Sequence, residues 1–535
     1  MIRDRAALGV FAVLFCWYML FSSGVPYRGQ AYIHFQGAFE LVQGRPLPPT
    51  YVGPGQTFLF VPFALLSYHL QLALRNDAAC WVVLILTANL FSALFTALTG
   101  VIVYRLARRA GHTPRLGIAA ALLYGLATPA AVYAKCFFPQ STECFFLTLA
   151  VWQLVEARER RDARAPLIVS GLAFGVLILV KVAAVAYVPA VVLWLAMSRD
   201  GEGRRRGAAR GLARIVTWAA PAAALCLLYF PYNSATHGDA LDFGYAAERD
   251  GLLRFSTPLL VGLYGLLFSP GKGLAWYAPV LWLAVPGARR LVARDRGLAL
   301  FILALLATAL LVHSRWWGWH GDNAWGPRYI IPVLPILSLL AVERLRRAEP
   351  RGGESGNLRV GADATWPARI AALAVLALVA LSAAIQALGA AFQGDAFQNT
   401  TYDTVIPHYR FEQGALGPPD DELGIHWIPE FSPLAGQAWL LRHALRGDAA
   451  DAYAADAPWR ALRPDGAWAP HVPSPPPEID LWITRLPREY PTTRPALLVI
   501  AAACLAGILA GIALSANASR QSRLLPSEPR EPASC

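Results

Sequence analysis

Long apolar runs that alternate with short Arg-rich stretches are the feature that most restricts how this chain can fold. A helix of about 20 apolar residues crosses a hydrocarbon core of roughly 30 Å with its backbone hydrogen bonds made internally. The composition agrees, since 56% of the 535 residues are hydrophobic and 15% are charged. We therefore predict an all-α polytopic membrane protein. The twelve predicted spans lie near residues 6–24, 79–105, 115–134, 140–157, 166–181, 182–198, 212–232, 274–288, 297–313, 329–344, 369–391 and 495–516.

The Arg-rich stretches predict the orientation of these spans. Of the 47 basic residues 44 are Arg, and 29 of these lie in seven short stretches between apolar runs. An excess of basic residues marks cytoplasmic loops, so the net charge of +12 indicates topology and not a nucleic-acid partner. The run 166–197 would extend roughly 48 Å as one helix. Because both of its flanks are Arg-rich, we divide it into two spans that turn near Lys181.

This division places all seven Arg-rich stretches and both termini on the cytoplasmic side. The Arg- and Ala-rich composition and the short cytoplasmic loops are typical of a bacterial inner membrane protein. The opposite face receives the outer loops, and two apolar stretches within them are not needed as spans. We expect 57–74 to lie along the interface, 257–268 to be re-entrant, and 392–494 to form a small external domain or cap. The predicted outer loops of the membrane core are about 25–78, 135–140, 233–273 and 314–328.

The segment His313–Tyr329, HSRWWGWHGDNAWGPRY, is the richest in chemical groups on the outer face. It contains four Trp, two His, two Arg and one Asp between two apolar runs. Trp faces suit sugar rings and isoprenoid chains, and the Arg fork suits phosphate. The chain has only three Lys, at 135, 181 and 272, and all three fall at predicted outer membrane edges. They suggest a shared anionic ligand, although chance or snorkelling of helix-end Lys explains such positions equally.

Several of these pieces resemble polytopic membrane glycosyltransferases of the GT-C type, which include protein O-mannosyltransferases and the aminoarabinose transferase of lipid A (family 39-like). The resemblance implies transfer of a sugar from a polyprenyl-phosphate donor to an unknown glycan, lipid or protein acceptor at the outer face. It also implies a GT-C-like core over 1–391, an external region over 392–494, a final span at 495–516 and a cytoplasmic tail at 517–535. The matching pieces are TPAAVYAKCFFPQSTECFF (128–146), FSPGKGLAWYAPVLWL (268–283), WHGDNAWGPRYIIPVLP (319–335), the weaker YVGPGQTFLFVPF (51–63) and HGDALDFGY (237–245), and the later WIPEFSPLAGQAWLL (427–441).

One departure from the family concerns the catalytic acid. The family places an Asp early in outer loop one, about fifteen residues before a Gly like Gly44. Here the neighbourhood reads YRGQAYIHF (27–35), with Gly29 and Gln30 where the acid is expected, and loop one has no Asp before Asp77. Catalysis by that acid is therefore in doubt, and another carboxylate must be sought.

Three acids are candidate catalytic residues, because an acceptor hydroxyl needs a carboxylate base or orienting group. Glu143 matches the place of a second acidic residue in related enzymes, but it could also cap the helix that begins near Gln140. Glu40 is the loop-one alternative, with a solvated acid as the competing interpretation. Asp322 could orient an acceptor or serve the HGDN turn. Asp239 and the nearby Asp242 are expected to cap loops, with metal contact as the lesser alternative.

Cationic and aromatic residues are the candidate ligand contacts. The departing lipid phosphate needs cations where its charge develops, and Arg328, in the WGPRY turn, is harder to explain by snorkelling than Arg315. His313, His320 and Asp322 could ligate a metal, but their spacing does not require one, so hydrogen bonding is favoured and a divalent metal stays open. The predicted substrate-binding residues are Lys135, Arg328, Lys272, Arg315, Trp319, His320, Trp325, Tyr329 and Arg28.

Three functions are compatible with these observations. The first is an inverting glycosyltransferase that uses a lipid-phosphate donor. The second is a non-catalytic protein that binds a lipid-linked sugar or assists an assembly partner, which the missing loop-one Asp favours. The third is a transporter or flippase, which ranks last because the spans carry almost no acids and the polar residues gather on one face. No Walker loop is present, which argues against an ATP-driven pump.

Overall fold

The structure of the chain is a computed structural model, and all regular secondary structure in the residues it describes is helical. The all-α prediction is therefore confirmed for these residues. Most of the predicted external region 392–494 lies outside them. The described residues are 4–25, 30–48, 52–74, 76–160, 162–197, 207–243, 255–321, 324–346, 366–392, 426–429, 432–447 and 479–524.

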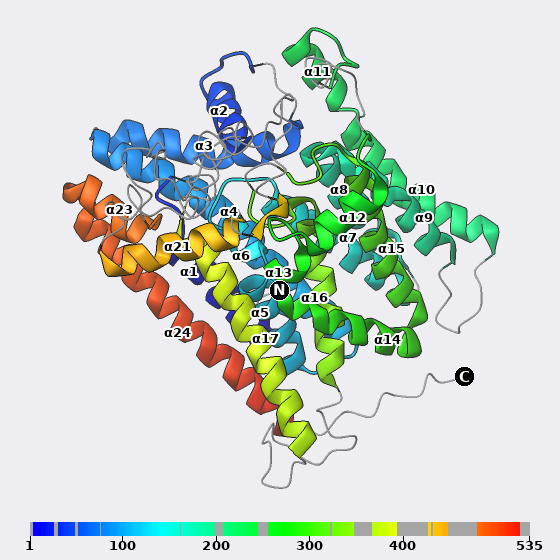
Figure 1. Cartoon of the computed structure of the whole chain (residues 1–535). Helices are drawn as coiled ribbons and strands as arrows, with labels where there is room; N and C mark the ends of the chain where they lie inside the picture. The colour runs from blue at the N-terminus through cyan, green and yellow to red at the C-terminus, as the bar shows by residue number, and fades with distance from the viewer. Residues whose placement is uncertain are drawn as a thin grey trace, which may run out of the picture.

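Figure 1 shows the helices of the described residues in chain order from blue to red. The α-helices are α1 (Arg5–Leu20), α2 (Gln30–Val42), α3 (Pro54–Leu74), α4 (Asp77–Arg109), α5 (Pro114–Ala127), α6 (Ala130–Tyr133), α7 (Gln140–Glu159), α8 (Arg164–Val180), α9 (Val188–Met197), α10 (Ala208–Cys226), α11 (Tyr229–His237), α12 (Leu259–Phe268), α13 (Leu274–Tyr277), α14 (Ala284–Arg294), α15 (Arg296–Arg315), α16 (Leu334–Leu345), α17 (Trp366–Ala391), α21 (Pro433–Arg446), α23 (Trp482–Glu489) and α24 (Arg494–Leu524). The 3-10 helices are η1 (Val182–Tyr187), η2 (Pro279–Leu283), η3 (Arg328–Val333) and η8 (Pro491–Thr493).

Six helical stretches of the described chain are long and apolar enough to cross a membrane, and five shorter apolar helices accompany them. This set agrees with a multi-pass membrane protein, and the number of twelve crossings stays a prediction. The six are Pro54–Leu74, Asp77–Arg109, Ala208–His237, Arg296–Arg315, Arg369–Ala391 and Pro491–Arg520; the shorter five are Arg5–Leu20, Pro114–Ala127, Arg164–Val180, Val182–Met197 and Leu259–Phe268.

α3 is long enough to cross a membrane, but it does not run in the direction of the long helices of the bundle. Figure 1 shows it lying across the end of the bundle at which α24 begins, not alongside α17 and α24. Its exposed leucines, among them Leu65 and Leu66, can enter the membrane interface from this orientation. α12 has 10 residues and is about 15 Å long, too short to cross, as a re-entrant segment requires.

The break predicted near Lys181 is present. Lys181 has extended backbone, with φ −146° and ψ 106°, between the end of α8 and the start of η1. The Arg158 guanidinium, next to the start of α8, lies over the Trp194 ring of α9 at 5.4 Å. The chain therefore returns to the level at which α8 began, which agrees with the two-span interpretation of 166–197; the two membrane crossings themselves stay a prediction.

Prolines divide two predicted spans that we expected to be continuous. The span predicted at 274–288 is split into α13, η2 and α14, with Pro279 opening η2. The span predicted at 329–344 begins as η3, which contains Pro332, before α16 continues. Proline has no N–H, and its ring clashes with the preceding turn of an α-helix, so these sites favour a break.

The Arg-rich loops meet at one end of the bundle. Arg158 pairs with Asp295 at 2.7 Å, and Glu343 pairs with Arg294 at 2.7 Å and with His112 at 3.1 Å. These contacts join four of the predicted cytoplasmic stretches, 105–115, 158–164, 289–296 and 344–369. Their placement on a common side is thereby confirmed, and we call this side the Arg-rich end.

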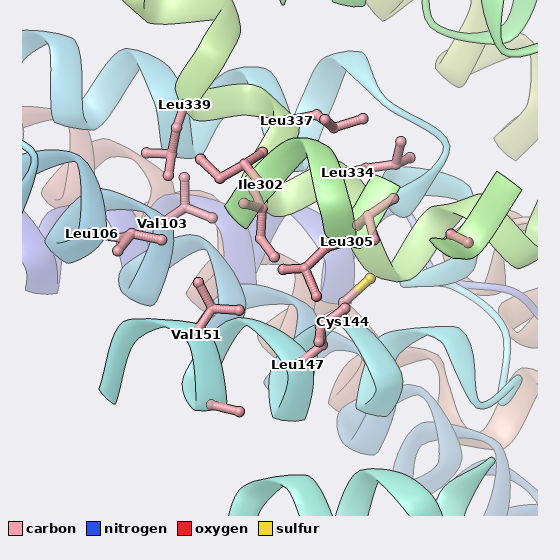
Figure 2. Packing of buried hydrophobic residues seen from close by; sticks show 14 of the residues in the cluster. Val103, Leu106, Cys144, Leu147, Val151, Ile302, Leu305, Leu334, Leu337 and Leu339 are labelled. Carbon is pink, nitrogen blue, oxygen red and sulfur yellow. The ribbon is translucent and has the colours of Figure 1, made fainter. Parts of the chain in front are cut away.

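The core between the two ends is built around α7. Figure 2 shows Leu147 and Val151 of α7 facing Val103 of α4 and Ile302 and Leu305 of α15. All five are buried, and they belong to one continuous apolar cluster. α7 is thus packed on several sides, which holds its first turn rigidly at the end of the bundle opposite the Arg-rich end.

Candidate functional site

Glu143 lies in the first turn of α7, directly after Pro139 and Gln140 begin the helix. Its backbone N–H donates to the Pro139 carbonyl oxygen at 2.8 Å, and the residue is 8% exposed. The helix dipole stabilises a carboxylate here, so the position fits the capping interpretation as well as the catalytic one. Among the described residues, carboxylate oxygen Oε1 has no hydrogen-bond partner. A buried acceptor of this kind can receive a hydrogen bond from a ligand.

The ring of Tyr329 brings two cations together. Arg328 and Tyr329 begin η3, and the Arg328 guanidinium carbon lies 5.0 Å from the Tyr329 ring centroid. Lys181 Nζ lies 5.7 Å from the same centroid. His313, in the last turn of α15, stacks on this ring with centroids 4.7 Å apart and 6° between the planes. Three distant parts of the sequence therefore meet at one aromatic ring.

Glu143 joins these residues electrostatically. Lys181 and Arg328 are the cations that act on its carboxylate. Lys181 also reaches loop one, because burial and the Lys181 charge lower the pKa of His34 in α2 to about 3. His34 Nδ1 lies 3.2 Å from Thr57 Oγ1 of α3. We call the group at the centre the Tyr329 cluster, and it consists of Glu143, Lys181, His313, Arg328 and Tyr329.

A glycine explains how the sequence before η3 accommodates Arg328. Gly321 has φ +69°, in the left-handed region that favours glycine, and lies in the middle of the Trp-rich segment. A Cβ atom at this position would lie 2.7 Å from both Cγ and Nε of Arg328. The turn and the position of the Arg328 side chain therefore both depend on the absence of a side chain at Gly321.

A second group gathers around Trp319. The rings of His320 and His426 stack with centroids 4.6 Å apart, and the Trp319 ring lies 5.6 Å from His426. Lys272 is fully buried, and its Nζ donates to the Ala324 carbonyl oxygen at 2.5 Å. Burial, Lys272 and His320 hold the pKa of His426 well below its usual range. We call this the Trp319 cluster, and it consists of Lys272, Trp319, His320, His426 and Trp427.

Lys135 is held by a buried ion pair. Its Nζ lies 3.4 Å from Asp480 Oδ2 and donates to the backbone carbonyl oxygens of Ala390 at 2.6 Å and Asp480 at 3.1 Å. The side chains of the pair are only 7% and 2% exposed. The three lysines of the chain thus lie in three different surroundings and are not brought around one ligand. The predicted role of Lys135 in substrate binding stays a prediction.

Three further predicted residues lie outside both clusters. Arg315 donates to a backbone carbonyl at 2.9 Å from an exposed position, which fits an interfacial Arg. The Glu40 carboxylate lies 3.8 Å from the Arg45 guanidinium, and an ion pair of this kind at the surface contributes little to stability. Trp325 is buried and packs edge-on against Tyr277, with centroids 4.9 Å apart. Their surroundings are those of interface and core residues, and their site roles stay predictions.

Two predicted residues, Asp322 and Arg28, fall outside the described residues. Asp239 Oδ1 accepts the Leu241 N–H at 2.9 Å, which is the loop-capping role expected for it. Within the described chain, no three His, Cys, Asp or Glu side chains gather in a way that could hold a metal ion.

The structure adds residues that we did not predict as site residues. Lys181 was singled out only as an outer-edge lysine, and its rarity was the available signal. His34 carried no motif of its own. His426 and Asp480 reach their partners from far along the chain, and no sequence pattern relates them to Lys272 or Lys135.

Three solved structures that match the chain are each at most 20% identical to it, with TM-scores below 0.5. ArnT from Cupriavidus metallidurans in the apo state is 20% identical, with a TM-score of 0.45, over 72% of this chain and 75% of that one. ArnT bound to undecaprenyl phosphate is 19% identical, with a TM-score of 0.42, over 75% of this chain and 79% of that one. The oligosaccharyltransferase AglB from Archaeoglobus fulgidus, in complex with an inhibitory peptide and a dolichol-phosphate, is 12% identical, with a TM-score of 0.48, over 77% of this chain and 59% of that one.

No curated protein matches the chain. Residues 78–232 match the model of the family described as dolichyl-phosphate-mannose-protein mannosyltransferase. This stretch includes Lys135, Glu143 and Lys181. The resemblance to polytopic glycosyltransferases of the GT-C type is therefore confirmed, and residues 78–232 are the part of the chain that carries the match to this mannosyltransferase family.

Proposed function

We propose that this protein transfers a sugar from a polyprenyl-phosphate donor to an acceptor hydroxyl at the predicted outer membrane face, with inversion at the anomeric carbon. The observation that carries the proposal is the Tyr329 cluster, in which Lys181 and Arg328 lie over one ring and both act electrostatically on the Glu143 carboxyl group. The family match of residues 78–232 supports a lipid-phosphate donor.

The reaction needs a proton acceptor and a place for the departing phosphate. Glu143 would accept the proton of the acceptor hydroxyl as that oxygen attacks the anomeric carbon. The bond between this carbon and the phosphate oxygen breaks, and its electron pair leaves with the polyprenyl phosphate. Lys181 and Arg328 would stabilise the charge that develops on the departing phosphate, the role expected of preorganised cations placed beside a leaving group.

The charges of the cluster suit an anionic ligand. Two cations share the face region of one ring, where cation–π attraction offsets part of their mutual repulsion. When ionised, the Glu143 carboxylate balances one of these two positive charges, both of which act on it electrostatically. A lipid phosphate beside them adds the negative charge that balances the group, and the low local dielectric strengthens that attraction.

Binding tests the phosphate part of the proposal. Purified protein in nanodiscs is titrated with undecaprenyl phosphate, and undecaprenol, which lacks the phosphate, serves as the control ligand. Arg328→Ala and Lys181→Met should each weaken binding of undecaprenyl phosphate and leave the weak binding of undecaprenol unchanged. Equal affinity of wild type and both variants for undecaprenyl phosphate would contradict the assignment of these cations.

Turnover separates this function from its rival. Vesicles containing the protein are supplied with polyprenyl-phosphate-linked hexoses and pentoses, and transfer to membrane glycans, lipids and proteins is followed. Glu143→Gln should abolish transfer and retain binding of undecaprenyl phosphate. The absence of an Asp before Asp77 in loop one favours a second candidate, a non-catalytic lipid-linked-sugar binding protein. Binding by wild type without turnover of any donor would support that candidate.

A further inference from the structure

Asp480 is a buried carboxylate at the junction of several distant segments. Its Oδ2 accepts the Ser23 hydroxyl at 2.5 Å, and its Oδ1 accepts the Gly24 N–H at 3.1 Å. The same carboxylate pairs with Lys135. Ser23 and Gly24 follow α1 and precede loop one, whereas Lys135 begins the turn between α6 and α7. One carboxylate therefore joins the entrance of loop one to the turn that leads into α7.

The backbone around Asp480 is bound to the same junction. The Asp480 N–H donates to the Ala391 carbonyl oxygen at 2.8 Å at the end of α17, where Lys135 also donates to Ala390. Trp482 is fully buried, and its backbone N–H donates to the Ser22 carbonyl oxygen at 3.0 Å. The segment 479–482 is thus seated between α1, α17 and the α6–α7 turn, and the ion pair lies at its centre.

The charges of this pair depend on each other. Both side chains are almost completely buried, and a buried charge whose partner is removed is strongly destabilised because water cannot replace the partner. Replacing both charges by neutral groups is far less disruptive, since no unpaired charge is left. Loss of Asp480 alone should therefore drive the Lys135 ammonium out of its position.

The turn that Lys135 begins leads directly to Glu143. Two carbonyl groups of this turn accept hydrogen bonds from neighbouring helices. Cys136 O accepts the Ser92 hydroxyl of α4 at 2.9 Å, and Phe137 O accepts the Gln56 amide of α3 at 2.7 Å. Thr142, next to Glu143, donates to Gln56 Oε1 at 2.9 Å. A displacement at Lys135 is therefore transmitted along a turn with little freedom to the first turn of α7.

We propose that Asp480 is a positioning residue, which fixes the α6–α7 turn through Lys135 and thereby sets the position of Glu143. This inference rests on the proposed function of Glu143, but the fixation of the turn is independent of it. In this view Lys135 acts through the protein and not by contact with the donor phosphate.

The neighbouring thiol reports on the turn without any substrate. Cys136 follows Lys135, is half-buried, and its Sγ lies 3.4 Å from the Val132 carbonyl oxygen. Maleimide labelling of the full-length protein in nanodiscs, resolved by peptide mass spectrometry, gives the reaction rate of Cys136 relative to that of Cys80. In Asp480→Asn, which keeps the shape of the side chain and removes its charge, this relative rate should rise at least about tenfold, the effect of a displaced buried charge.

Catalysis is measured on the same variants with the donor that wild type uses. Asp480→Asn should lower kcat by up to about 100-fold, as misplacement by about 1 Å can do, with KM for the donor changed less than about threefold. Asp480→Glu should recover part of kcat. The matched control is Glu489→Gln, which neutralises the carboxylate of the exposed Arg485–Glu489 pair on α23. This variant should change neither the labelling rate of Cys136 nor kcat.

The double variant Lys135→Met with Asp480→Asn decides between positioning and substrate contact. If the unpaired Lys135 ammonium is what displaces the turn in Asp480→Asn, the double variant, which has no unpaired charge, should recover labelling protection and much of kcat relative to Asp480→Asn. A double variant that is protected but has lost affinity for undecaprenyl phosphate would overturn the proposal in favour of direct contact by Lys135.

The two proposals fail in different ways. Unchanged Cys136 labelling in Asp480→Asn would overturn the positioning role whether or not the protein is an enzyme. Increased labelling with unchanged kcat would also overturn it, because Glu143 would not depend on the turn. If Asp480→Asn increases Cys136 labelling but the wild-type protein turns over no donor, the positioning role of Asp480 stands and the proposed function is refuted instead.

Discussion

Replacing Gly321 by Ala should displace Arg328 and weaken the binding of a lipid phosphate. The added Cβ would lie 2.7 Å from Arg328 Cγ and Nε and 2.9 Å from Cδ, whereas ordinary contact begins at 3.4 Å. These atoms are in the middle of the side chain, so a rotation of the guanidinium alone does not relieve the clash. The whole Arg328 side chain must move by at least several tenths of an ångström.

The expected magnitude has two parts. The backbone at φ +69° costs a residue with a Cβ roughly 1–2 kcal/mol, and this strain lowers the free energy of unfolding. Displacement of Arg328 removes a charge-assisted hydrogen bond to the phosphate, worth about 1.5–3 kcal/mol. The second part corresponds to a roughly 10- to 150-fold weaker Kd for undecaprenyl phosphate.

Gly44→Ala is the matched control. Gly44 has the same φ of +69°, but a Cβ there would meet no heavy atom within 4 Å. Both variants should show a similar loss in Tm, measured by thermal unfolding in nanodiscs. Only Gly321→Ala should lose affinity for undecaprenyl phosphate. Equal affinities of the two variants would refute the assignment of Arg328 to the ligand.

Three further predictions concern other parts of the structure. Because the pKa of His426 is held well below its usual range, the folded protein binds fewer protons than the unfolded chain as the pH falls. The free energy of unfolding should therefore decrease as the pH drops below about 6.5. His426→Gln should reduce this dependence, measured as Tm between pH 5 and 8. Tyr329→Leu should raise the Kd for undecaprenyl phosphate about five- to tenfold, whereas Tyr329→Phe, which keeps the ring beside both cations, should raise it less than about threefold. Gly171→Ala should lower the free energy of unfolding by about 1–3 kcal/mol because its Cβ would lie 2.1 Å from the Trp218 carbonyl oxygen, while Gly207→Ala, in open space, should leave Tm unchanged.

The apolar helices and the grouping of four Arg-rich stretches were largely predictable from the sequence, because apolar length and Arg placement are local properties. The division of 166–197 followed from the charge on its two flanks, and the structure breaks the helix at Lys181. The shared side of four Arg-rich stretches followed in the same way. Two breaks were missed although their signal was present, since Pro279 and Pro332 lie within the runs we expected to be continuous.

The candidate site was only partly predictable. Glu143, Arg328 and Tyr329 were selected from the residue types and from the resemblance, and the structure brings all three together. Their association with Lys181 was not predicted, because Lys181 reaches the Tyr329 ring from the break between α8 and η1, a different part of the chain. The three lysines were expected to share an anionic ligand, but Lys135 and Lys272 are engaged in different surroundings.

By itself the sequence determined an all-helical membrane protein, the common side shared by four of its Arg-rich stretches, and the segments that carry reactive side chains. These follow from hydrophobicity and charge, which act over one helix or one loop. Only the tertiary structure decided which side chains are neighbours, as when Asp480 meets Lys135 across 345 positions of the chain. Such pairs form because packing buries both charges together, and no local pattern records a partner that packing alone supplies.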